Sequence, residues 1–345
     1  MGVRAREGDF IETTEGLIFD VKGLSHPADR IIAFLRYYPK TDGNRFRDGI
    51  HYGKIYSLSE RYDFLEKNYP QYLFYDKLSD ETLQGIPIKN IKKIYCPEEF
   101  IKKFVRRNQI KGREADSLVL KKGLNMLNLI HTQSGVGYDK MGISGSVLVN
   151  LETDESDIDL IIYGSKNACK VYDSLSKMHH DQLEVIHPYS ETEIAKLYKF
   201  RGKESNLNLQ EFAKIERRKK LQGIFDGTEY YIRCIKDRDE ILHNYEEIQY
   251  KCVGKGTLSG VITDDTEAIL TPCKYLIDVS RMEGVNFSGK IQEIASFRGR
   301  FCEQAKKGEQ IKASGKIELV KSPEDEFYRL LIGSYSEDFF RVLNL

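Results

Sequence analysis

The sequence predicts an α+β protein with a small twisted sheet in its middle third, and three observations support this prediction. Short β-like runs separated by turns dominate the first hundred residues, helical and strand-like segments alternate over residues 101–245, and short strands return from residue 246 onward. A chain of 345 residues is long enough for two or three domains. We therefore expect an N-terminal mixed α/β unit (1–100), a central core (101–245) and a C-terminal β-rich barrel or sandwich (246–345).

The composition argues against several classes of protein. The 53 basic residues are balanced by 53 acidic residues, so no overall field draws the protein to nucleic acid or to a membrane surface. The six cysteines show no CxxC spacing and no cluster with histidine, which argues against a zinc site and a disulfide framework. No apolar run reaches the length of a membrane span, and the first residues lack a signal-peptide pattern. The sequence therefore predicts a cytoplasmic protein without membrane contact.

The first hundred residues predict a sheet with one helix. The expected elements are a hairpin formed by residues 9–13 and 17–21, strands over 29–38 and 52–57, and a helix over 59–68 that Ser59 caps. Aromatic side chains alternate here with basic ones, namely Arg30, Arg36, Arg45, Arg47 and Lys54. Such a mixture fits either a surface that stacks the bases of single-stranded nucleic acid or a tyrosine-rich core with an ordinary solvated face. The sequence leaves both interpretations open.

Two helical regions frame the expected core. The first covers residues 97–131 with a break near Lys111-Gly112, and its second half carries an apolar stripe at helical spacing. The other covers residues 165–178, with Ser165 as its N-cap, and a short strand is expected over residues 183–187. The helices should pack against a small sheet formed by the apolar runs between them.

Two aspartates interrupt one of these apolar runs. Residues 157–162 read DIDLII, so Asp157 and Asp159 project from one face of the expected strand while Ile158 projects into the protein. The two carboxylates lie about 7 Å apart along the strand and repel each other unless a cation lies between them. Carboxylate oxygens are the ligands of hard divalent cations, so the pair predicts a site for Mg²⁺ or Mn²⁺. The alternative is an exposed acidic hairpin with turn residues at Ser156-Asp157.

A pair of small residues, Gly145-Ser146, precedes the aspartates, with ten residues between the two motifs. Glycine leaves the main chain accessible, and backbone N–H groups beside a serine hydroxyl suit a phosphate group. A metal-binding pair next to a phosphate-holding turn is the minimum apparatus for transferring a nucleotidyl or phosphoryl group.

Gly145-Ser146, the ten-residue spacing and Asp157-x-Asp159 in an apolar strand together resemble the signature of the DNA polymerase beta-like nucleotidyltransferase superfamily. The resemblance extends over about residues 112–237, although its specific part covers about twenty residues. With its flanking units, the chain looks like an archaeal group of predicted nucleotidyltransferases. The resemblance implies a polymerase beta-like core in which Asp157 and Asp159 hold metal while Gly145 and Ser146 hold the phosphates of a nucleoside triphosphate.

Many members of the superfamily have a third carboxylate on a later strand, which helps to bind metal and to orient or deprotonate the attacking hydroxyl. The best later strand here covers residues 229–235, and Arg233 stands where the resemblance leads us to look for aspartate. Glu229 and Glu184 are the available substitutes. The guanidinium of Arg233 could instead bind a triphosphate or an RNA phosphate.

Residues 211–222 predict a basic helix that leads to this strand. Its basic residues are Lys214, Arg217, Arg218, Lys219 and Lys220. Phosphate contacts would explain the run, and a solvated helix face is the alternative.

The last hundred residues predict a small β barrel or sandwich. The expected strands cover residues 248–253, 257–262, 268–270, 275–279, 290–297, 310–313 and 316–320, with glycine-containing turns between them. Arg298 and Arg300 alternate with Phe297 and Phe301, which fits either a nucleic-acid contact or structural packing. Residues 326–345 should close the chain with helix or irregular turns.

These expectations converge on a metal-dependent nucleotidyltransferase that transfers a nucleoside monophosphate from a nucleoside triphosphate to an acceptor hydroxyl. RNA, and a tRNA-like end in particular, is the expected acceptor, with a protein or a small molecule as alternatives. The expected catalytic residues are Asp157, Asp159 and Glu229, and the expected nucleotide-binding residues are Gly145, Ser146, Arg233, Arg217 and Arg218. The competing class is a non-catalytic nucleotide- or RNA-binding module built on a degenerate core.

Overall fold

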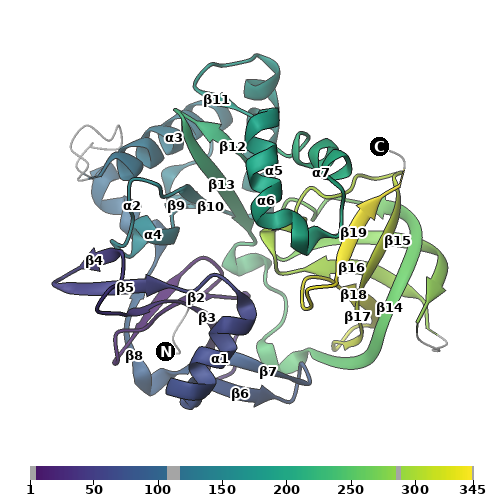
Figure 1. Cartoon of the computed structure of the whole chain (residues 1–345). Coiled ribbons are helices and arrows are strands. Elements are labelled where there is room, and N and C mark those ends of the chain that lie inside the picture. Colours follow the sequence, from purple (N-terminus) through teal and green to yellow (C-terminus); the bar gives the residue numbers. More distant parts are fainter. Residues whose placement is uncertain (1–4, 107–116, 285–288, 344–345) are drawn as a thin grey trace. The chain divides into compact units, whose positions relative to one another are not determined.

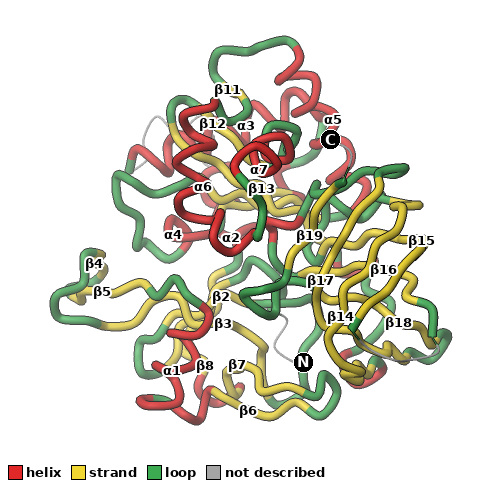
Figure 2. The backbone as a smooth tube through the Cα atoms, turned by 45° about the vertical axis from the view of Figure 1, so that its right-hand side comes forward, coloured by secondary structure: helices red, strands yellow, loops and turns green. Residues whose placement is uncertain are grey.

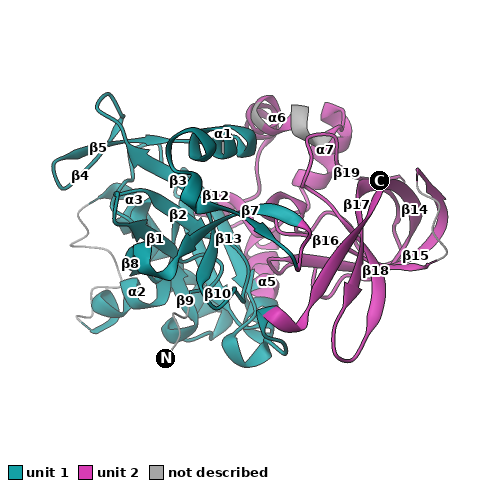
Figure 3. Cartoon of the chain, turned by 90° about the horizontal axis from the view of Figure 1, so that it is seen from below, with its two compact units in different colours: residues 1–77, 81–171, 225–245 teal, residues 78–80, 172–224, 246–345 magenta. Residues whose placement is uncertain are grey.

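The computed structural model of the protein describes residues 5–106, 117–284 and 289–343. The architecture is α+β, and the chain divides into two compact units (Figure 3). Unit 1 contains residues 1–77, 81–171 and 225–245, whereas unit 2 contains residues 78–80, 172–224 and 246–345. The N-terminal sheet and the strand that carries the two aspartates therefore belong to the same compact unit.

Unit 1 consists of a large N-terminal sheet, a group of shorter core strands and the helices packed on them (Figure 1). Its strands are β1 (Phe10–Thr13), β2 (Ile18–Val21), β3 (Arg30–Pro39), β4 (Arg45–Arg47), β5 (Ile50–Lys54), β6 (Leu73–Asp76), β7 (Glu81–Pro87), β8 (Ile91–Tyr95), β9 (Met141–Ile143), β10 (Ile158–Tyr163) and β13 (Thr228–Ile235). Its helices are α1 (Leu58–Asn68), α2 (Pro97–Arg106), α3 (Leu118–Ser134) and α4 (Gly145–Leu148), and α5 (Ser165–His180) begins in this unit. The expected helix break near Lys111-Gly112 lies outside the described residues.

The N-terminal sheet has the strand order β4-β5-β3-β2-β1-β8, with β7 also paired to β3 and β6 paired to β7. The hairpin predicted from the sequence is confirmed as the β1–β2 pair. The helix expected to begin after Ser59 begins instead after Ser57, whose hydroxyl accepts the N–H of Glu60. Ser57 therefore satisfies one of the amides at the helix start, and the prediction of Ser59 as the cap is wrong.

A β-bulge at Arg36 changes which way β3 faces. Ile18 and Phe19 are consecutive on β2, yet they pair with Tyr37 and Leu35, so Arg36 is an extra residue on β3. Leu35 packs in the core on one face of the sheet, whereas Tyr37 packs with Leu148 and Val149 on the other. Because the bulge shifts the alternation by one residue, Arg36 and Tyr37 project to the same side of the sheet.

β10 lies between β9 and β13 in the core of unit 1. It pairs antiparallel with β9 and parallel with β13, and its residues Ile158, Leu160 and Ile162 are buried as the alternation predicts. α3 packs on this layer where Gly123 approaches Ile143 closely. α5 follows β10 directly, but its first turn is capped by a distant carboxylate: the backbone N–H of Ser165 donates to Glu240 at 2.9 Å. The expected capping role of the Ser165 side chain is therefore replaced by that of Glu240.

Unit 2 combines a helical segment with a closed barrel. Its helices are α6 (Glu191–Ser205) and α7 (Leu209–Glu216), and its strands are β11 (Ile186–His187), β12 (Gln222–Phe225, at the unit boundary), β14 (Gln249–Asp264), β15 (Cys273–Glu283), β16 (Ile291–Ser296), β17 (Gln310–Lys321), β18 (Glu326–Leu331) and β19 (Phe339–Val342). The predicted basic helix over residues 211–222 is wrong in its second half, because α7 ends at Glu216 before most of the basic residues.

The C-terminal strands close into a five-stranded barrel in the order β14-β15-β16-β18-β17-β14, and Figure 2 shows them as one group of yellow strands. Neighbours are antiparallel except β16 and β18, which are parallel, and β19 adds to the free part of the β17 edge. This is a Greek-key arrangement of the kind found in OB folds. The strand order alone identifies no ligand.

Two predicted turns in this region are wrong. The pairs of strands expected around Gly256 and Gly315 are single long strands, β14 and β17, in which these two glycines pair with each other. A side chain on Gly315 would lie 2.4 Å from the carbonyl oxygen of Leu331. The glycines therefore allow close approach of neighbouring chains rather than a turn. Residues 326–331 and 339–342 are strands, so the helix or irregular turns expected there are also corrected.

Candidate functional site

The two aspartates of the sequence motif occupy one face at the start of β10. Asp157 immediately precedes the strand and is exposed, and Asp159 is half-buried within it. Burial raises the pKa of Asp159 to about 7, and the charge of Asp157 adds to the shift. No side-chain hydrogen bond or ion pair of either carboxylate is formed within the described residues. The pair is therefore a concentration of negative charge that forms no ion pair with any described residue of the chain.

Gly145 lies directly against the Asp159 carboxylate. β9 ends at Ile143, the backbone N–H of Ser144 donates to the carbonyl oxygen of Asp159 at 2.9 Å, and α4 then begins. Gly145 has a φ of +63°, and a side chain there would lie 2.0 Å from Oδ2 of Asp159. Both the backbone conformation and the available space therefore require glycine. The structure brings together the two halves of the sequence motif.

Ser144, which the sequence analysis did not single out, holds the start of α4 in place. Its hydroxyl donates to the carbonyl oxygen of Gly8 at 2.7 Å and makes no capping hydrogen bond to the helix. The backbone N–H groups of the first helical turn have no acceptor within a helix. Because the Ser144 hydroxyl is bonded to Gly8, it does not cap the backbone N–H groups at the start of α4, next to Ser146.

On the third strand, β13, the residue opposite Asp159 is Tyr231, and Arg233, where a third carboxylate is expected, lies two residues further along. In the parallel β10–β13 pair, Asp159 is opposite Tyr231 and Ile161 is opposite Arg233. Glu229 lies on the same face, near the level of Asp157, whereas Glu184 lies in an exposed turn of unit 2. Within the described residues, no three His, Cys, Asp or Glu side chains are grouped closely enough to hold a metal ion. Glu229 shares the face but does not complete a metal-binding triad.

Arg233 is held by two acidic residues of the N-terminal segment, Glu7 in the turn before β1 and Asp20 on β2. Its guanidinium lies 2.7 Å from Glu7 and 3.5 Å from Asp20, and Lys22 contacts the same two carboxylates. Burial opposes ionisation of Asp20, but the charges of Lys22 and Arg233 outweigh it and hold the pKa of Asp20 below its ordinary value. In this structure Arg233 is an ion-pair partner inside the fold.

Two further cations face the aspartates from the N-terminal sheet. The bulge directs Arg36 to this side, and Lys54 pairs with Tyr37 across β3 and β5. Lys54 is half-buried, with its Nζ atom 4.8 Å from the Tyr56 ring. Burial and the charge of Arg36 lower the pKa of Lys54 to about 8, whereas Asp157 and Asp159 oppose that shift. Within the described residues, neither cation forms an ion pair.

The other basic residues of the N-terminal unit have structural contacts. Arg45 donates to the carbonyl oxygen of Leu151, and Arg47 donates to that of Val149 at 3.2 Å while pairing with Glu12 at 2.8 Å. These hydrogen bonds hold the segment between Ser146 and Asp157 against the N-terminal sheet. Arg30 pairs with Asp29. The tyrosine-rich core is confirmed, since Tyr37, Tyr52 and Tyr72 are fully buried.

The basic run that follows α7 is also engaged in ion pairs. Arg217 lies 2.8 Å from Glu191, and Arg218 pairs with Glu309 and donates to the carbonyl oxygen of Gln304. All of these residues belong to unit 2. The structure therefore gives Arg217 and Arg218 partners of their own.

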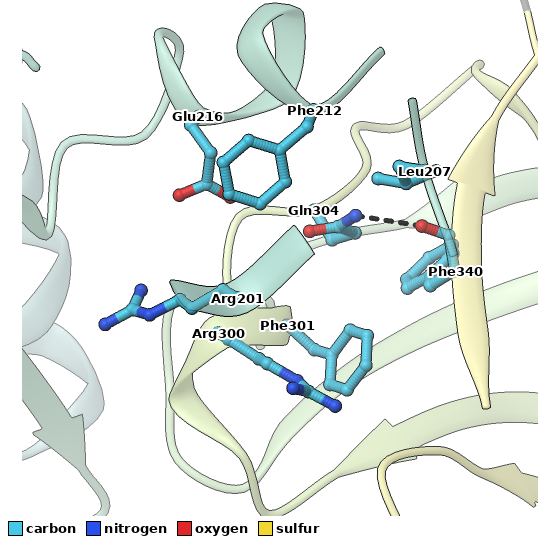
Figure 4. A pocket seen from close by; sticks show the side chains of 8 residues that line it. All are labelled: Arg201, Leu207, Phe212, Glu216, Arg300, Phe301, Gln304 and Phe340. Atoms are coloured by element: carbon cyan, nitrogen blue, oxygen red, sulfur yellow. Dashed lines mark hydrogen bonds between the residues drawn. The ribbon is translucent and has the colours of Figure 1, made fainter. Parts of the chain in front are cut away.

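A small cavity in unit 2 offers no alternative site for a ligand of nucleotide size. Its volume of about 20 Å³ holds about one water molecule. Arg201 and Arg300 both line it but point in different directions, and Gln304 donates to the carbonyl oxygen of Phe340 at 2.8 Å (Figure 4).

The donor set at the aspartate pair fits a magnesium ion. Mg²⁺ is commonly held by one or two carboxylates, with water and substrate phosphates completing its coordination. Asp157 and Asp159 supply such a pair. The pKa of Asp159 is raised first by burial and then by the charge of Asp157, and a cation there would offset both effects. The site does not offer the full protein cage that a structural metal would require.

Comparison with known proteins gives one informative match. A protein of the archaeon Methanocaldococcus jannaschii, "Uncharacterized protein MJ1086", is 34% identical over 354 residues, which cover 100% of this chain and 99% of that protein. The chain belongs to the same family. No family model matches the chain, and no solved structure matches it. In the described part of the chain, no helix is long and apolar enough to cross a membrane.

Proposed function

We propose that the protein is a metal-dependent nucleotidyltransferase that transfers a nucleoside monophosphate from a nucleoside triphosphate to a hydroxyl of RNA. The observation that carries this proposal is the contact between Gly145 and the Asp159 carboxylate, next to an Asp157 that has no ion-pair partner in the described residues. The nucleotidyltransferase core, the magnesium or manganese ion and the cytoplasmic location are parts of the same proposal.

In this mechanism Asp157 and Asp159 hold the metal, and the uncapped N–H groups at Gly145 and Ser146 bind phosphate oxygens. The metal ion, when bound, neutralises charge on the phosphates and orients the α-phosphate. The acceptor hydroxyl attacks the α-phosphorus, the new O–P bond forms as the bond to the β-phosphate oxygen breaks, and pyrophosphate leaves. The hydroxyl proton passes to a carboxylate or to water, and Glu229 lies on the correct face of the sheet to accept it.

The second candidate is a nucleotide- or RNA-binding module without catalysis. Tyr231 opposite Asp159, and Arg233 in the position where an acid was expected, favour it. Magnesium-dependent release of pyrophosphate separates the two candidates, because a binding module retains nucleotide without turnover.

The test is a transfer assay with each α-labelled nucleoside triphosphate, Mg²⁺ or Mn²⁺, and total cellular RNA as the acceptor. We expect label in RNA with the wild type and none with Asp157→Asn. Asp154→Asn is the matched control, because Asp154 is an exposed carboxylate in the turn just before the motif. If Asp157→Asn transferred label to RNA at the wild-type level, the assignment of Asp157 to the catalytic site would be wrong. Label on protein or on a small molecule would replace RNA as the acceptor, and nucleotide binding without transfer would favour the second candidate.

A further inference from the structure

Arg36 and Lys54 are basic residues near the aspartate pair whose charged groups have no acidic partner within the described residues, although Lys54 Nζ lies 4.8 Å from the Tyr56 ring. Within the described residues, neither forms an ion pair, whereas Arg45, Arg47 and Arg233 in the same unit all have acidic or carbonyl partners. Both side chains are half-buried. A partly desolvated cation without an acidic partner is costly to the folded state, so an anion that binds there is stabilised.

Their placement depends on two features of the N-terminal sheet. The bulge opposite Ile18 inserts Arg36 and directs it to the face on which Tyr37 lies. The pairing of Tyr37 with Lys54 places Lys54 on that same face, since directly paired residues of neighbouring strands project to one side. Bulges commonly re-aim side chains next to binding sites. The two cations therefore form one local patch.

This patch lies close enough to the aspartates for the charges to interact. The charges of Arg36 and Lys54 act on Asp159 together with that of Arg233, and the charges of both aspartates act on Lys54. Arg36 also acts on Asp20, deeper under the N-terminal sheet. A ligand held by the aspartates and by Gly145 would thus have the two cations along its other side.

We propose that Arg36 and Lys54 bind the polyphosphate chain of the nucleotide, on the side of the aspartate pair that the N-terminal sheet covers. This inference rests on the proposed function, and it assigns to these two residues the nucleotide-binding role that the sequence analysis predicts for Arg233, Arg217 and Arg218. A compact anion with several charges fits two adjacent cations in a half-buried position better than an extended nucleic-acid backbone does. The guanidinium of Arg36 can donate two parallel hydrogen bonds to one phosphate, and Lys54 supplies a point charge.

The test is calorimetric titration of the full chain with inorganic tripolyphosphate in the presence of EDTA, so that no metal contributes. We expect Arg36→Met and Lys54→Met each to weaken binding by about tenfold or more, and the double variant to show no binding. Arg30→Met is the matched control, because Arg30 lies on the same strand but pairs with Asp29 and stacks on Phe74. Its affinity should stay within about twofold of the wild type.

Arg36→Lys provides a second variant that keeps the charge and loses the planar donor pair. We expect its affinity for tripolyphosphate to lie between those of the wild type and Arg36→Met. If Arg36→Met does not fold, the Arg36→Lys variant decides the role of Arg36. Thermal unfolding of every variant checks the fold. Equal affinities of the wild type and the double variant, an equal loss in Arg30→Met, or no binding by the wild type would overturn the inference.

The transfer assay separates this inference from the proposed function. If the Arg36 and Lys54 variants lose tripolyphosphate but the wild type transfers no nucleotide, the anion site stands and the enzymatic proposal falls. If the variants transfer nucleotide with wild-type KM and kcat, the anion site falls and the enzymatic proposal stands. The last control adds an RNA that carries no triphosphate as a competitor. If this RNA displaces tripolyphosphate with the same affinity, the two cations bind a nucleic-acid backbone and not the nucleotide, and the inference is overturned.

Discussion

Two groups of charges, contributed by β10, β13 and the N-terminal segment, are arranged in opposite ways. In the first group, Arg233 and Lys22 are matched by Glu7 and Asp20 at ion-pair distance. In the second group, Asp157, Asp159, Arg36 and Lys54 form no ion pairs within the described residues. Each group contains two cations and two anions, so they differ in pairing and not in net charge.

The difference separates structural charges from charges available to a ligand. Charges that are buried and paired in the fold neutralise one another and leave little field for a ligand. Charges that have no ion-pair partner in the fold remain available to a metal ion and a phosphate. We therefore refer to the first group as the paired group and to the second as the open group. The predictions below test this division.

The largest expected effect is on activity, from Asp159→Asn in the open group. Transfer should fall by about 10³-fold, the order found when a group that stabilises transition-state charge is removed. Without metal, the variant should be at least as stable as the wild type, because a half-buried carboxylate that is repelled by Asp157 has been removed. Single-turnover transfer and thermal unfolding in EDTA measure the two effects. A variant that is unstable and active would place Asp159 in the paired group instead.

Gly145→Ala should disturb the open group through its geometry. The alanine methyl would meet the Asp159 carboxylate, and a displacement of about 1 Å can reduce the rate by about 10²-fold. Gly135→Ala is the matched control, because Gly135 has a similar φ of +70° but no atom within 4 Å of the added methyl. Both variants should lose about 1 kcal/mol of unfolding free energy to backbone strain. Equal activity of the two variants would show that the contact between Gly145 and Asp159 has no catalytic role.

Arg233→Met should act on stability, because Arg233 belongs to the paired group. Removing it leaves Glu7 and Asp20 buried with only Lys22, and we expect a loss of about 3 kcal/mol at pH 7. The pKa of Asp20 is held below its ordinary value, so this stabilisation is present above pH 3.8 and disappears as the pH falls below it. The difference between variant and wild type should therefore narrow under acidic conditions.

Denaturant unfolding from pH 3 to pH 8 measures this stability difference, and Glu7→Gln combined with Arg233→Met provides the double-mutant cycle. The KM for nucleotide should change by less than about threefold if Arg233 is only structural. A large rise in KM with unchanged stability would instead support the phosphate-binding role that the sequence predicted for Arg233.

The parts of the site that the sequence predicted are those determined by local pattern. The alternation around Asp157 and Asp159 defines the faces of β10, and a spacing of ten residues brings Gly145 back against Asp159. The strand that contains Arg233 was also predicted within one residue. These features depend on strand periodicity and on glycine chemistry, both of which are visible in a short window.

The parts that the sequence did not predict depend on contacts between distant residues. Glu7 and Arg233 are 226 positions apart, so no local pattern shows that Arg233 is already paired. The direction of Arg36 depends on a bulge opposite Ile18, and a bulge is defined by the partner strand. Gly256 and Gly315 were interpreted as turn residues because their pairing in the barrel is likewise non-local. Local composition did reveal that basic and aromatic residues mix in this unit, but not which of them face the aspartates.

Asp9 tests how completely the charges around the paired group are compensated. Asp9 lies near Arg6, which itself pairs with Glu98 and Asp237 at the other end of β10. Burial raises the pKa of Asp9 to about 7, although it accepts the backbone N–H of Arg6 at 3.0 Å. A raised carboxyl pKa contributes stability that is complete below pH 3.8 and is lost as the pH rises through 7.

Asp9→Asn keeps an acceptor for that N–H and cannot ionise. We therefore expect it to match the wild type near pH 4 and to be more stable by up to about 4 kcal/mol at pH 8. Asp139→Asn, at an exposed position of the same unit, is the control and should follow the wild type at every pH. If Asp9→Asn were less stable than the wild type at pH 8, Asp9 would be ionised and matched by Arg6. Asp9 and Arg6 would then join the paired group at the Tyr163 end of β10, and only the open group around Asp157 would lack ion pairs among the charges compared.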